Sequence, residues 1–324
     1  MKKIKLIPDN TNVPFIRMRL IAFAISAVLI LGSAGAFLTV GLNKGIDFEG
    51  GILMEVGLEK APDLASMRSS LGNLGIGSVA LQTFGRETDI LIRAERQPGE
   101  AAAQEAAVEK IKQQLTADYG ENVSLRRVEF VGPKVSGELI MVAVQAVILS
   151  MIGMLIYIWL RFEWQYSVAA IIGLLHDVII TVGMYTLTRI EFNLTSIAAL
   201  LTIVGYSIND TVVIYDRIRE NVRRYKKMPM AEMINLSLNE TLSRTTMTGV
   251  TTLLALGALY FFGGEVIRGF AFAMIVGVVV GTYSSIFVCA PILLYFGVRH
   301  PADEDGTGKF AAAEQAEAKI NKNS

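Results

Sequence analysis

The segment that decides the fold runs from residue 194 to residue 215 and reads LTSIAALLTIVGYSINDTVVIY. It is long enough to cross a bilayer, because about 20 apolar residues span the hydrocarbon core, and it carries a single carboxylate, Asp210. Lipid offers the backbone no hydrogen-bond partner, so an apolar segment of this length is expected to be a helix. Five further blocks of this kind cover residues 20–42, 138–160, 165–188, 245–263 and 269–297. The sequence thus predicts a multi-span α-helical membrane protein with six transmembrane helices.

Short basic segments indicate the orientation, because loops rich in Lys and Arg stay in the cytoplasm. Cations are frequent in residues 1–19 and 216–244, whereas the turns 189–193 and 264–268 hold one Arg each. We therefore expect a cytoplasmic N-terminus at 1–19, a cytoplasmic loop at 216–244 and a cytoplasmic, disordered tail at 298–324. In a cell with two membranes this topology corresponds to the inner membrane. The first block exceeds the roughly 7–15 residues of a signal-peptide core, which favours an uncleaved anchor.

Between the first two spans, residues 43–134 are expected to form an external, periplasmic domain. Alternating apolar residues and turn signals predict strands, and Ala/Glu/Lys-rich stretches predict helices. The predicted order is β-α-β-β-α-β, which is typical of a ferredoxin-like α+β domain. Its predicted elements are strands at 52–58, 79–84, 89–94 and 123–130 and helices at 62–74 and 101–119. The domain has no His, Cys or nucleotide-binding glycine motif, so a binding or lever role is expected.

Composition argues against several classes of function. Lys plus Arg and Asp plus Glu both number 30, so no basic excess favours nucleic acid. The one cysteine, Cys289, and the two histidines, His176 and His300, form no motif for a metal or a nucleophilic catalyst. We expect neither an enzyme nor a bound cofactor.

Ionisable residues inside a span are costly and are therefore functional candidates. Asp210 lies about 24 Å into its span at 1.5 Å per residue, beside a sector with Gly205 and Asn209 that should permit close helix approach. Arg244 opens the fifth span, where it could couple to Asp210 or simply extend to the interface. Asp177 lies mid-span and could couple protons more weakly or hydrogen-bond between helices.

The chemistry of the two charges separates their roles. Arginine keeps its proton at any working pH, so Arg244 can only be a counter-charge. A carboxylate can be loaded and unloaded, and a guanidinium that moves toward or away from Asp210 would change its proton affinity. His176 precedes Asp177, but helix neighbours point about 100° apart, so a shared face and a proton relay are not required by the sequence.

Several strings resemble, in the same order, the signatures of the SecF family of protein-export membrane proteins. They are GIDFEGG (45–51), VGPKVSGEL (131–139), RFEW (161–164), LHDVIIT (175–181), GYSINDTVV (205–213), DRIREN (216–221) and TLSRT (241–245). The resemblance covers residues 20–297 and implies the resistance-nodulation-division architecture.

The resemblance also implies partners and site residues. The partners would be SecD, the SecYEG channel, the translocating unfolded polypeptide and membrane lipid, with SecA and YajC indirect or accessory. A proton or sodium gradient would supply the energy, and Asp210 with Arg244 would be the transport-linked pair. In the GIDFEGG string, Gly45, Gly50 and Gly51 would shape the chain, and Asp47 could tie the domain base to the membrane.

Two other functions stay open. The chain could be a structural subunit while SecD alone carries ions, or it could be half of a small-molecule efflux pump. The small external domain argues against the efflux pump.

Overall fold

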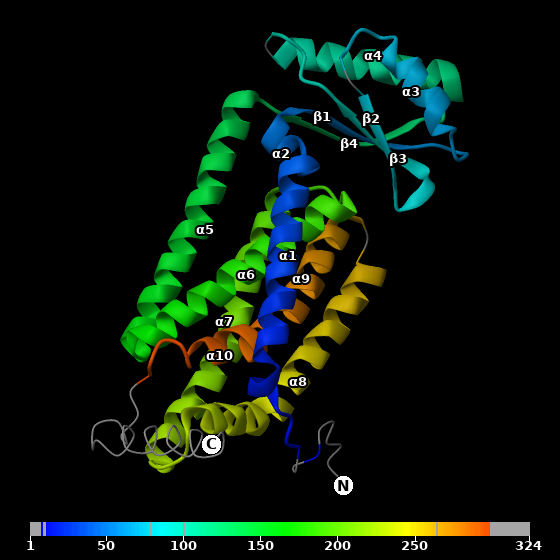
Figure 1. Cartoon of the computed structure of the whole chain (residues 1–324). Coiled ribbons are helices and arrows are strands. Elements are labelled where there is room, and N and C mark those ends of the chain that lie inside the picture. Colours follow the sequence, from blue (N-terminus) through cyan, green and yellow to red (C-terminus); the bar gives the residue numbers. More distant parts are fainter. Residues whose placement is uncertain (1–7, 9–10, 78, 100, 264, 299–324) are drawn as a thin grey trace.

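The computed structural model describes residues 8, 11–77, 79–99, 101–263 and 265–298, which form a helix bundle with a sheet domain at one end (Figure 1). Six of the described helices are long and apolar enough to cross a membrane, as expected. They are α1 (Arg19–Thr39), α5 (Pro133–Arg161), α6 (Trp164–Thr188), α7 (Leu194–Arg224), α8 (Met230–Phe262) and α9 (Glu265–Ser284). A short 3-10 helix, Phe15–Met18, precedes α1, and a π turn, Ser285–Cys289, leads from α9 into α10 (Ala290–Ile292). Within the predicted tail 298–324, residues 299–324 lie outside the described part of the chain.

The segment 216–244, expected as a loop, is helical except for residues 225–229. Its polar residues are compatible with a helix, and one face carries apolar residues that the bundle buries, among them Ile218, Met233 and Leu238. Helix α8 then begins directly after Pro229, whose fixed φ suits a helix start. The bundle therefore continues beyond the apolar spans as a helical hairpin.

Helices α6, α7 and α9 form the centre of the bundle, and α1, α5 and α8 are more exposed. Half or more of the apolar window of each central helix is buried, compared with 6% of the α5 window. Close packing of α7 against α9 depends on Gly277 and Gly281, because a Cβ at Gly277 would overlap the Ile203 side chain. At Gly205, which was expected to permit close helix approach, no other helix of the described chain comes near: apart from its own helix backbone, no atom lies within 4 Å of the place where its Cβ would stand.

The sheet domain has the predicted β-α-β-β-α-β order. Its strands are β1 (Gly51–Gly57), β2 (Val79–Phe84), β3 (Arg86–Ala94) and β4 (Ser124–Val131), and its helices are α3 (Leu64–Gly72) and α4 (Ala101–Tyr119). The sheet order is β2-β3-β1-β4, and every neighbouring pair is antiparallel. This is the arrangement of a ferredoxin-like domain.

Both faces of the sheet bury apolar side chains. One face packs Ile52, Met54 and Ile92 against the helices α3 and α4. The other face packs Leu53 and Leu91 against Ile46, which belongs to the short helix α2 (Ile46–Glu49) at the top of α1. Successive side chains of a strand alternate between faces, so β1 contributes Ile52 and Met54 to the domain core and Leu53 to the opposite face. That opposite face, which contacts α2, is the base of the domain.

Candidate functional site

A buried carboxylate, Asp177, lies where α6, α7 and α9 meet. Its side chain is 1% exposed, and it accepts hydrogen bonds from Ser207 of α7 (2.6 Å) and Ser284 of α9 (2.9 Å). Gly281 leaves room for this contact, since a Cβ there would stand 3.0 Å from Ser207 Cβ. The three central helices are thus linked through one carboxylate.

His176 extends this network to α1. Its Nδ1 lies 2.9 Å from Asp177 Oδ1, and its Nε2 lies 3.2 Å from Ser26 Oγ. Ser26 in turn lies 3.2 Å from the hydroxyl of Tyr283, which donates to the Ala22 carbonyl. The neighbours His176 and Asp177 therefore do meet, although helix geometry alone did not require it.

Asp210 is also buried, at 3% exposure, but its environment differs. Its Oδ2 has no hydrogen-bond partner among the described residues. It lies three residues after Ser207 on α7, about 4.5 Å further along the helix axis. A buried carboxylate oxygen without a donor is unusual, since buried polar atoms are nearly always hydrogen-bonded.

Arg244 lies on α8, which packs against α7, and its side chain is exposed. Its charge is near enough to act electrostatically on Asp210, yet the two residues form no ion pair in the described part of the chain. Three threonines follow Arg244 on α8. Thr248 and Thr251 donate to carbonyls of their own helix, whereas Thr252 accepts a hydrogen bond from the Tyr206 hydroxyl at 3.3 Å. The structure thus brings the charges into the same region and leaves them unpaired.

Gly205 and Asn209 lie one turn apart on α7, away from this buried centre. Asn209 is exposed, and Gly205 is partly exposed. Sequence reasoning placed both beside the coupling residues and gave no role to Ser26, Ser284 or Tyr283. Hydroxyl-bearing residues inside apolar spans were the available signal for those three, but their partners are on other helices.

The glycines of the GIDFEGG string shape the base of the sheet domain. Gly50 and Gly51 have φ values of +73° and +127°, which side chains with a Cβ rarely adopt. A Cβ on Gly51 would also lie 2.7 Å from the Ala94 carbonyl oxygen, and one on Gly45 would lie 2.5 Å from Glu191 Oε1. Gly50 and Gly51 therefore need glycine for their conformation, and Gly51 needs it for space as well. Gly45 has an ordinary φ of −77°, so glycine there only leaves room for the Glu191 side chain.

Asp47 connects this base to the bundle. Its Oδ2 accepts the backbone N–H of Leu194, the first residue of α7, at 2.9 Å. A carboxylate at a helix N-terminus satisfies a free donor and interacts favourably with the helix dipole. The chain on either side supports the link, because Gly45 donates to the Phe192 carbonyl (2.8 Å) and Phe192 donates to the Asn43 carbonyl (2.8 Å).

An ion pair lies beside this junction. Arg93 of β3 contacts Glu191 in the turn between α6 and α7, and both side chains are about four-fifths buried. Burial raises the pKa of Glu191 above its ordinary value, with Asp47 and Glu129 adding to the rise, although Arg93 acts in the opposite direction. The junction is therefore held by a partly desolvated pair that sequence patterns did not reveal.

Comparison with known proteins agrees with this arrangement. The SecD/SecF C-terminal family of protein export membrane proteins matches residues 111–299, and the SecD/SecF GG motif matches residues 35–62. The chain belongs to the SecF family. The protein translocase subunit SecF of Rickettsia felis is 47% identical over 91% of this chain and 96% of its own length. That of Cereibacter sphaeroides is 46% identical over 91% of this chain and 93% of its own.

Two solved structures share the fold. The crystal structure of SecDF from Thermus thermophilus, a translocon-associated membrane protein, matches with a TM-score of 0.80 at 37% identity. SecDF in its super-membrane-facing form matches with a TM-score of 0.65 at 32% identity. This SecF-family chain is covered to 91% and 95% in these matches but spans only 40% of either SecDF chain. The family membership and the Sec-pathway role expected from the sequence are confirmed.

Proposed function

We propose that this SecF-family chain, together with SecD, uses an ion gradient to promote late steps of polypeptide translocation through SecYEG. It would act in the inner membrane with both termini in the cytoplasm, would bind no cofactor and would catalyse no covalent reaction. The SecF name of the relatives and the SecDF structures support the association with SecD. SecA and YajC would act indirectly.

The observation that carries the ion-coupled role is the contrast between the two buried carboxylates. Asp177 has hydrogen-bond partners at both carboxylate oxygens, the two serines at Oδ2 and His176 at Oδ1, so its role in this state is to hold helices together. Asp210 keeps one oxygen without a donor while the Arg244 charge stays nearby and unpaired. A carboxylate in that condition can take up a proton, and a small shift of α8 against α7 would pair it with Arg244 and favour release.

The energy scale fits such a role. One proton that moves down a potential of 100 mV releases about 2.3 kcal/mol, so several protons would be needed for a sizeable mechanical step. The Asp47 contact gives such a step a route to the sheet domain, because it joins the start of α7 to the domain base. Asp210 lies on that same helix.

The test is a translocation assay in vesicles with and without a proton gradient, using wild type, Asp210→Asn and the control Glu220→Gln. Glu220 lies on the same helix outside the buried centre, so its variant should keep gradient-dependent stimulation. We expect Asp210→Asn to co-purify with SecD in wild-type amounts and to lose the stimulation. If Asp210→Asn keeps the stimulation, the ion-coupled role is wrong and a structural role is favoured. If it no longer binds SecD, the residue supports assembly instead.

A further inference from the structure

A charged pocket lies where the end of α5 meets α7. Figure 1 shows that this end of α5 lies opposite the sheet domain. The volume of the pocket is about 390 Å³. It is lined by Arg161, Asp216, Arg219, Glu220, Arg223 and Arg224. Two segments far apart in the sequence, RFEW and DRIREN, thus come together at a site for which the proposed function has no use.

Both acidic residues of the pocket are ion-paired. Asp216 pairs with Arg161 at 2.8 Å, and Glu220 pairs at 2.6 Å with Arg217, which also pairs with Glu240 at 2.8 Å. Arg219 is held toward the pocket because its Nη1 donates to the Arg161 carbonyl at 3.2 Å.

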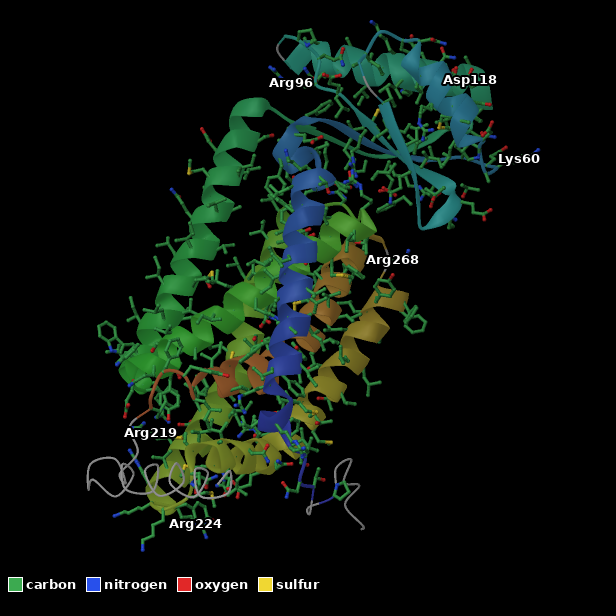
Figure 2. The ribbon with its side chains drawn as sticks, viewed as in Figure 1. Lys60, Arg96, Asp118, Arg219, Arg224 and Arg268 are labelled. Atoms are coloured by element: carbon green, nitrogen blue, oxygen red, sulfur yellow. The ribbon has the colours of Figure 1, made fainter. Side chains whose placement is uncertain are left out.

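Three guanidinium groups therefore remain for a ligand. In the described part of the chain, Arg219, Arg223 and Arg224 form no ion pair with a carboxylate. Arg219 and Arg223 are four residues apart and so lie on one face of α7. Figure 2 shows Arg219 and Arg224 at the end of the bundle that lies away from the sheet domain. The pocket therefore carries an excess of positive charge that matches an anion.

The surroundings of the pocket indicate the kind of anion. Trp159, Leu160 and Trp164, next to Arg161 in the chain, are 60%, 84% and 54% exposed. Exposed tryptophans on spanning helices are typical of the headgroup level of a bilayer. Further along α5, Ile148, Ile152 and Ile156 are exposed, and Ile148 lines an apolar pocket with Phe37 of α1 and Ile197 of α7. This apolar stripe suits contact with acyl chains. Guanidinium groups at this depth face lipid phosphates, which they bind with paired hydrogen bonds.

We propose that this pocket binds the headgroup of an anionic bilayer phospholipid. The phosphate lies between Arg219, Arg223 and Arg224, and the acyl chains lie along the exposed face of α5 past Trp159. Each Arg near a lipid phosphate contributes about 1 kcal/mol, so removal of two of them should weaken binding about 30-fold.

Intrinsic fluorescence gives a direct test, because the two tryptophans of the chain, Trp159 and Trp164, lie two and three residues from Arg161, which lines the pocket. The full chain is placed in phosphatidylcholine nanodiscs, and either brominated phosphatidylglycerol or brominated phosphatidylcholine is added as the quencher. We expect quenching of wild type at a clearly lower fraction of brominated phosphatidylglycerol, and loss of that preference in 1 M NaCl.

The decisive comparison is Arg223→Gln/Arg224→Gln with Lys226→Gln/Lys227→Gln. Both variants lose two charges at the same end of the bundle, but Lys226 and Lys227 lie outside the pocket. We expect only the arginine variant to lose the preference. Equal loss in both variants, or no preference in wild type, would overturn the proposal in favour of general surface charge or no site. A wild-type preference that disappears when SecD is bound would also overturn it, because the pocket would then be a protein interface.

Discussion

At the scale of single residues, Asp177 is the acceptor on which three helices converge. Its loss would leave the Ser207 and Ser284 hydroxyls and the His176 ring without their buried partner. Hydrogen bonds inside membrane bundles contribute about 0.6 kcal/mol on average and up to about 1.7 kcal/mol each. We therefore expect Asp177→Ala to lower the free energy of unfolding by about 2 kcal/mol or more.

Reversible unfolding in mixed micelles, followed by circular dichroism, measures this loss. Ser284→Ala serves as the control, because it removes only one of the hydrogen bonds and should cost roughly a third as much. Equal effects of the two variants would mean that Asp177 does not hold the network.

Alanine substitutions at Gly277 and at Gly205 should have opposite effects on stability. A methyl group on Gly277 meets the stiff, β-branched Ile203 side chain, so Gly277→Ala should push α7 and α9 apart and destabilise the bundle by about 1–3 kcal/mol. Gly205 has open space at its Cβ position, and alanine favours a helix over glycine by up to about 1 kcal/mol. Gly205→Ala should therefore leave the thermal midpoint unchanged or raise it. A lower midpoint for Gly205→Ala than for Gly277→Ala would contradict the packing described above.

At the scale of elements, the sheet domain is joined to the bundle by a strand-like contact, a helix cap and an ion pair. Arg93 is the only one of these groups that offsets the buried charge of Glu191. Because the pKa of Glu191 is raised in the folded protein, its ionised form lowers stability as the pH rises from 4.5 through the raised pKa. Without Arg93 that pKa should rise further, and the loss should extend to higher pH.

We therefore expect Arg93→Ala to loosen the junction at neutral pH and to resemble wild type at low pH, where Glu191 is protonated. Hydrogen exchange of the Gly45 and Phe192 amides measures this, since both amides bond across the junction. The double variant Arg93→Ala/Glu191→Gln should restore slow exchange at neutral pH. Fast exchange in the double variant would show that Arg93 acts by packing rather than by charge.

At the scale of the whole molecule, an exposed polar residue within a span indicates a surface that contacts another protein. Asn209 is exposed within a spanning helix, where contact with lipid would be costly. Ile148 of α5 is also exposed, but it is apolar and suits lipid. The face of α7 that carries Asn209 should therefore contact SecD in the assembled complex.

Cysteine cross-linking in membranes tests this expectation, with Asn209→Cys as the probe and Ile148→Cys as the control. We expect Asn209→Cys to form a cross-link to SecD and Ile148→Cys to form none. The reverse result would place SecD against α5 and leave Asn209 facing lipid or water.

The number of spans, the element order of the sheet domain and the family could all be predicted from the sequence. These features depend on local signals: the length of an apolar block, the alternation of residues along a strand, and short strings such as GIDFEGG. The reason is that each signal reflects a requirement of its own segment, such as the need of a spanning backbone to bond within itself. The helical state of 216–224 and 230–244 was missed because the buried apolar faces of these two segments depend on contact with each other and with the bundle.

Only the tertiary structure decided which carboxylate is held and which has a free oxygen. Asp177 and Asp210 are both acids inside apolar helices, and nothing in their own segments says that serines from two other helices reach one of them. The same holds for the Arg93–Glu191 pair, the meeting of RFEW with DRIREN, and the helix contact at Gly277 rather than Gly205. Each of these depends on distances between segments far apart in the chain, which are set by packing and not by local pattern.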